Sequence, residues 1–79
     1  MTARNDRRHR IQKYPIPLVR KAIDDTVYGA DNVQIVTDLY IGNLTHEQVA
    51  ENAHLSTRGL YKRLDHIMPS VEQYLNRIN

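Results

Sequence analysis

Apolar residues recur along this chain at the spacing of amphipathic helices. In the segment 17–28, Val19, Ile23 and Val27 fall at four-residue steps, which places them on one face of a helix. Two prolines at the start of the segment pre-set the backbone for a first helical turn. Gly29 follows the segment, so the sequence predicts that this helix stops there in a left-handed conformation.

The next segment, from about residue 31 to 41, is denser in apolar residues and is expected to be buried on more than one side. Three of its residues have helical spacing, namely Val33, Val36 and Tyr40. A helix is favoured over a strand because strict alternation of apolar and polar residues is missing. Asp31 or Asn32 is expected to cap the start of this helix, and Gly42 with Asn43 to end it.

Three further short helices are predicted in the last part of the chain, over residues 45–53, 56–66 and 70–78. Thr45 and Gln48 have the spacing of a capping box, in which each side chain bonds to the backbone of the other residue. Ser56 is a capping residue for the second of these helices. Pro69 is expected to end that helix, because proline lacks the amide hydrogen that a helix interior requires.

These five short helices leave little room for a sheet, so the sequence predicts an all-α fold. The chain has 79 residues, the size of one small domain, which we place at residues 14–79. It contains no cysteine, which excludes disulfides and thiolate metal sites. No run of about 18 apolar residues is present to span a membrane, and we expect a cytoplasmic protein.

The first 13 residues are polar and are expected to form a flexible basic arm. Five of the eleven lysines and arginines lie in this arm: Arg4, Arg7, Arg8, Arg10 and Lys13. Asp6 is the single acid among them, whereas the rest of the chain carries six basic and eight acidic residues. A basic arm on a nearly neutral body favours a polyanionic partner, with a solubilising tail as the alternative.

Residues 45–64, THEQVAENAHLSTRGLYKRL, combine a short helix, a tight turn and a second helix, which is the helix-turn-helix pattern. We expect this unit to extend over residues 45–67. Ala50 supplies the small side chain that a close crossing of the two helices requires. Leu55 is the apolar residue that the turn directs inward, and Leu60 holds the second helix from within.

The run from Val49 to Ser56 resembles bacterial helix-turn-helix DNA-binding proteins, in which valine-alanine is followed by three residues, glycine, an aliphatic residue and serine. The wider segment from Leu39 to Leu64 resembles region 4 of the sigma-70 factors. Gln48 stands where the sigma pattern has an acid. His54 stands where the family has glycine, so it must accept a positive φ or reshape the turn.

The resemblance implies that the second helix enters the major groove of double-stranded DNA. Four residues on its outward face are then expected to contact base edges: Thr57, Arg58, Tyr61 and Lys62. Phosphate contacts are expected from the helix ends and from the arm: Thr45, His46, Ser56, Arg63, Arg4, Arg7, Arg8 and Arg10. Two alternatives remain open, in which Tyr61 packs back on Ile67 or Met68 and Arg63 pairs with Asp38 or another acid.

The leading hypothesis is sequence-specific DNA binding by a small bacterial or phage transcriptional regulator. One alternative is a protein-interaction module that binds RNA polymerase, as region 4 of sigma factors does. Another is a phage accessory protein for DNA packaging or recombination. The apolar stripe of residues 70–78 is expected to close the core, with a homodimer through this helix as the alternative. We expect no cofactor, metal site or enzymatic activity, because the spacings that these require are missing.

Overall fold

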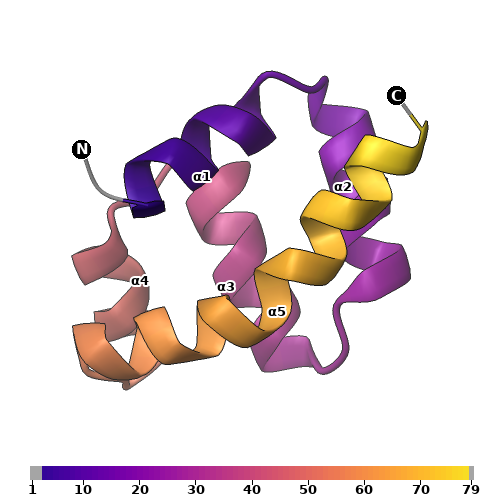
Figure 1. The fold of residues 1–79 in the computed structure, drawn as a ribbon. Helices are drawn as coiled ribbons and strands as arrows, with labels where there is room; N and C mark the ends of the chain where they lie inside the picture. Colours follow the sequence, from indigo (N-terminus) through magenta and orange to yellow (C-terminus); the bar gives the residue numbers. More distant parts are fainter. Residues whose placement is uncertain (1–2, 79) are drawn as a thin grey trace.

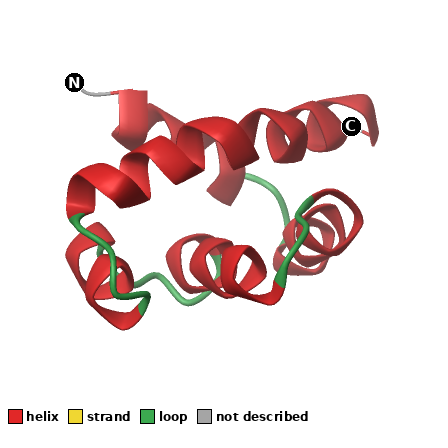
Figure 2. Cartoon of the chain, turned by 90° about the horizontal axis from the view of Figure 1, so that it is seen from below, coloured by secondary structure: helices red, strands yellow, loops and turns green. Residues whose placement is uncertain are grey.

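The computed structural model describes the backbone of residues 3–78 and the side chains of residues 7–78. The described chain folds into five helices: α1 (Ala3–Gln12), α2 (Ile16–Thr26), α3 (Ala30–Tyr40), α4 (His46–Asn52) and α5 (Thr57–Ile78). Loops join them and no strand occurs between residues 3 and 78 (Figure 2). The predicted all-α class is therefore confirmed.

Helix α5 connects the two ends of the molecule (Figure 1). Its beginning lies beside α4, and its end lies beside α2. Helix α3 contacts α1, α2 and α4, so it is covered on several sides, as its apolar density predicted. Helix α1 lies at the edge of this arrangement and contacts α2 and α3. No helix of the described chain has the length and apolar character needed to span a membrane.

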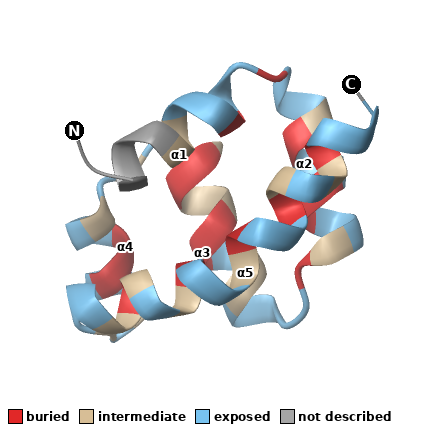
Figure 3. Cartoon of the chain, in the orientation of Figure 1, coloured by how far each residue is buried: buried red, intermediate tan, exposed pale blue. Residues whose placement is uncertain are grey.

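The core is built mainly from the buried faces of α5, α3 and α2 (Figure 3). Five side chains of α5 are completely buried: Leu60, Leu64, Met68, Val71 and Leu75. Four side chains of α3 face them or the neighbouring helices: Ile35, Val36, Leu39 and Tyr40. Val71 and Leu75 thus close the core within a single chain, while Ile78 at the end of the same stripe is 48% exposed.

The helices predicted at 56–66 and 70–78 are one continuous helix, so the expectation that Pro69 ends a helix was wrong. A proline in a helix interior costs about 3 kcal/mol, because one hydrogen bond is lost and its ring crowds the preceding turn. Met68 and Val71, on either side of it, are both fully buried, and each contributes about 1.5–3 kcal/mol through burial. Packing therefore holds the helix together across the proline. The axis of α5 changes direction along its length (Figure 1), for which a proline is a common cause.

The N-terminal segment also differs from the expected flexible arm, because residues 3–12 form α1. Ile11, the single strongly apolar residue of this helix, is 1% exposed and belongs to the core. Tyr14 follows it, is buried, and donates a hydrogen bond from its hydroxyl to Asn76 Oδ1 at 3.2 Å. The composition of this segment suggested an arm, because its charged residues outnumber its few apolar residues.

The boundaries of α3 were predicted correctly at one end only. The helix begins at Ala30 after Gly29, whose φ of +93° no side chain adopts easily, and no side chain caps it. The expected cap by Asp31 or Asn32 was therefore wrong, and the Asn32 side chain donates from Nδ2 to the Tyr28 carbonyl at 3.0 Å. The helix does end before Asn43, which takes the left-handed conformation with φ +61°.

Candidate nucleic-acid interface

The start of α4 carries the predicted capping box. The Gln48 amide donates to Thr45 Oγ1 at 3.1 Å, and the Thr45 amide donates to Gln48 Oε1 at 3.0 Å. The hydroxyl of Thr45 accepts within its own helix. These two bonds satisfy donors that the first turn of a helix leaves free, so they fix where α4 begins.

The turn between α4 and α5 contains a residue in the left-handed backbone conformation, His54. His54 has φ +59°, which decides between the two possibilities that the sequence left open. The Leu55 amide then donates to the Ala50 carbonyl at 2.8 Å, which ties the turn to the end of α4. Ser56 caps α5 as predicted, because its Oγ accepts the Gly59 amide at 3.0 Å.

Buried contacts fix the orientation of α4 against α5. Val49 and Ala50 on α4 are 1% and 2% exposed, and Leu60 and Leu64 on α5 are completely buried. Leu55 is half-buried in the turn and packs against the same core. Close packing of this kind resists small displacements. The outward face of the first turns of α5 is therefore presented on a rigid support.

Four residues of that outward face were predicted to contact bases. Three of them are exposed, namely Thr57, Arg58 and Lys62. Within the described residues, Arg58 and Lys62 make no hydrogen bond or ion pair. Tyr61 is half-buried, and its ring centroid lies 5.2 Å from that of His46 at an interplanar angle of 55°. The Tyr61–His46 contact joins the outward faces of α4 and α5 into one surface.

The residues predicted to contact phosphates at the helix ends have mixed environments. Thr45 and Ser56 are exposed, but both hydroxyls accept backbone hydrogen bonds in the caps. His46 is half-buried. Arg63 is half-buried and donates from Nη1 to Asn32 Oδ1 at 3.4 Å. Its hydrogen-bond partner is thus the side-chain oxygen of Asn32 on α3, and not Asp38 or another acid, which the sequence left as the alternative.

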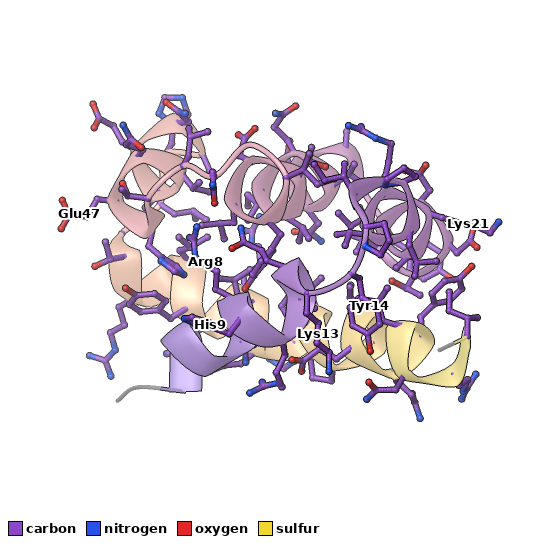
Figure 4. All side chains as sticks on the ribbon, turned by 90° about the horizontal axis from the view of Figure 1, so that it is seen from above. Arg8, His9, Lys13, Tyr14, Lys21 and Glu47 are labelled. Carbon is purple, nitrogen blue, oxygen red and sulfur yellow. The ribbon has the colours of Figure 1, made fainter. Side chains whose placement is uncertain are left out.

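The three described arginines of α1, Arg7, Arg8 and Arg10, bond to the protein's own polar groups. The Arg7 guanidinium pairs with Asp65 at 3.2 Å and its side chain is 13% exposed. Arg10 pairs with Glu72 at 2.8 Å. Arg8 donates to Asn43 Oδ1 and to the Leu44 carbonyl, both at 3.2 Å, and Figure 4 shows it directed toward that loop. The Arg4 side chain lies outside the described residues.

Sequence reasoning missed these partners because they lie far away in the chain. Arg7 and Asp65 are 58 residues apart and Arg10 and Glu72 are 62 residues apart, and a list of charges cannot show which basic residue faces which acid. Burial raises the pKa of Tyr40, and the positive charge and hydrogen bond of Arg7 oppose that rise. Arg7 therefore acts mainly as an internal group between α1, α3 and α5.

The described residues contain no cluster of three or more histidine, cysteine, aspartate or glutamate side chains that could hold a metal ion. Neither protein-family models, nor curated proteins, nor solved structures give a match to this chain. The functional argument therefore rests on the residues and on their arrangement.

Proposed function

We propose that this chain binds double-stranded DNA by placing the first turns of α5 in the major groove, as a small transcriptional regulator would. The observation that carries this proposal is the free, exposed pair Arg58 and Lys62 on a helix whose opposite face is completely buried. An α-helix fits the major groove, and arginine recognises guanine there through two parallel hydrogen bonds.

Local charge also supports DNA binding at this face. Asp65 follows Lys62 on α5 and its side chain is 65% exposed, so it would repel a phosphate nearby. The ion pair with Arg7 neutralises it. No acid precedes Asp65 on α5, so the first turns of this helix present Arg58, Lys62 and Arg63 without a negative side chain among them.

The test is the affinity of the full chain for duplex DNA, measured by fluorescence anisotropy over a range of salt concentrations. The variant is the double substitution Arg58→Ala with Lys62→Ala. Loss of one bidentate base contact costs about 1–3 kcal/mol, or roughly fivefold to 150-fold in affinity. Each lost phosphate contact should also reduce the slope of log K against log salt by about 0.9.

The matched control removes the same two charges from another surface. Arg20 and Lys21 are adjacent exposed residues of α2, and Lys21 makes only a surface ion pair with Asp25 at 3.6 Å. Figure 4 shows Lys21 at the opposite end of the molecule from Glu47 of α4. We expect Arg20→Ala with Lys21→Ala to retain nearly full affinity. Equal affinity of both double variants would assign the α5 face to a different partner, and RNA polymerase is then the first to test.

A further inference from the structure

A shallow, open groove of about 720 Å³ lies on the surface between the first turn of α3 and the middle of α5. Residues 29–32 form one wall, and α5 forms the other with Lys62, Arg63 and His66. Two of these basic side chains, Lys62 and His66, are exposed. Arg63 is held in place by its hydrogen bond to Asn32. The groove thus combines three nitrogen-bearing side chains on one helix with a fixed opposite wall.

The α3 wall adds to the positive character of this groove. The first backbone bond of α3 runs from the Val33 amide to the Gly29 carbonyl at 3.0 Å. The amides before Val33 have no acceptor inside the helix, and no side chain caps this end. Asp31 is the one acid among the described residues that line the groove. Lys62 and Arg63 outweigh its charge, so an anion is favoured.

The groove begins where the proposed DNA-contacting face ends, because Lys62 belongs to both. Arg58 and His66 are eight residues apart on one helix, which corresponds to roughly 12 Å along its axis. This is about the width of the major groove of B-DNA. With α5 directed across the groove and Arg58 at the base edges, the turn of α5 around His66 would lie near the sugar–phosphate strand that borders the groove.

We propose that this groove holds a backbone phosphate of the bound duplex, with His66 and Arg63 as its ligands together with the first amides of α3. The inference rests on the proposed DNA binding and adds a second contact region, at His66 and residues 29–32. The proposed phosphate contact should contribute to the affinity for duplex DNA of any sequence, because a phosphate is the same at every base pair.

The test compares two variants that add the same negative charge to exposed positions of α5. His66→Glu places a carboxylate in the groove, and Gln73→Glu places one about two turns further along the helix. We expect His66→Glu to weaken binding to duplexes of any sequence by about tenfold, the effect of one lost hydrogen bond to a charged group. Gln73→Glu should change the affinity less than about twofold, and circular dichroism should show that both variants fold.

Failure of this inference and failure of the proposed function give different results. If Arg58→Ala weakens binding while His66→Glu and Gln73→Glu behave alike, the groove is not a phosphate site and the α5 face still binds DNA. If the unmodified chain does not bind duplexes, both proposals are overturned.

A second measurement separates a duplex phosphate from free phosphate. Amide chemical shifts of residues 30–32 are followed by nuclear magnetic resonance during titration with duplex DNA and, separately, with inorganic phosphate. Perturbation of these amides by the duplex, weakened by His66→Glu, supports the proposal. Saturation by inorganic phosphate with no response to the duplex would assign the groove to a free anion and overturn it.

Discussion

His54→Gly should stabilise this protein, because His54 is held in a conformation that side chains disfavour. Its φ is +59°, and a residue with a Cβ in this region costs about 1–2 kcal/mol. Glycine removes this cost, but it loses about 0.5–1 kcal/mol through the greater freedom of the unfolded chain. His54 is exposed, so little packing is lost. We expect a net gain of up to about 1 kcal/mol in the free energy of unfolding.

Asn43→Gly is the informative comparison, because Asn43 has nearly the same φ, +61°, but a different side-chain environment. Asparagine tolerates the left-handed region better than most residues, so less strain is relieved. Its Oδ1 also accepts hydrogen bonds from Arg8 at 3.2 Å and Gln12 at 2.8 Å, which join α1 to the end of α3. Loss of both bonds should reduce the free energy of unfolding by about 1 kcal/mol.

Urea unfolding followed by far-ultraviolet circular dichroism measures both variants. For a domain of this size, 1 kcal/mol corresponds to roughly 4–8 °C in Tm, so thermal unfolding gives an independent check. The expected result is a higher midpoint for His54→Gly and a lower midpoint for Asn43→Gly. A decrease for His54→Gly similar to that for Asn43→Gly would refute the argument from backbone strain.

Three further predictions concern the core and the charged contacts. Leu64→Ala should lower the free energy of unfolding by about 2–5 kcal/mol, measured by urea unfolding, because Leu64 is completely buried. Arg7→Met should leave stability within about 1 kcal/mol, because Met fills the same space and Asp65 is mostly exposed. It should also raise the pKa of Tyr40 further, measured by ultraviolet titration, because the opposing charge of Arg7 is lost. The hydrogen bond from Tyr74 to Asp25 raises the pKa of Tyr74, and burial raises that of Tyr40. The contribution of these two tyrosines to the free energy of unfolding is therefore complete below the ordinary tyrosine pKa of 10.0 and is lost as the pH rises through their raised pKa values. Urea unfolding at a series of alkaline pH values should show this decline.

The segment from Thr45 to Leu64 was predicted well because its structure is determined by neighbours in sequence. The capping box, the cap by Ser56 and the left-handed turn at His54 each involve residues at most a few positions apart. Such local signals are readable from the order of residues alone. The exposure of Arg58 and Lys62 likewise follows from helical spacing once the buried stripe is known.

The remaining differences come from long-range packing. The sequence of residues 3–12 is that of a polar tail. In the structure Ile11 packs into the core, and Arg7, Arg10 and Arg8 bond to Asp65, Glu72 and Asn43 respectively. Pro69 alone predicts a helix end, but the buried residues before and after it lie on one continuous face of α5. In both cases a local preference is overcome by contacts between residues that are distant in sequence.

The continuity of α5 has a consequence for the proposed DNA binding. A helix that ended at Pro69 would leave the first turns of α5 supported by α4 alone. In the continuous helix, Leu75 lies in the core beside α2 at one end, and Leu60 lies in the core beside α4 at the other. Helix α1 adds its own links to α5 through Arg7 and Arg10. The exposed face around Arg58 is thus carried by the whole fold, so binding there requires little ordering of the protein and loses little affinity to it.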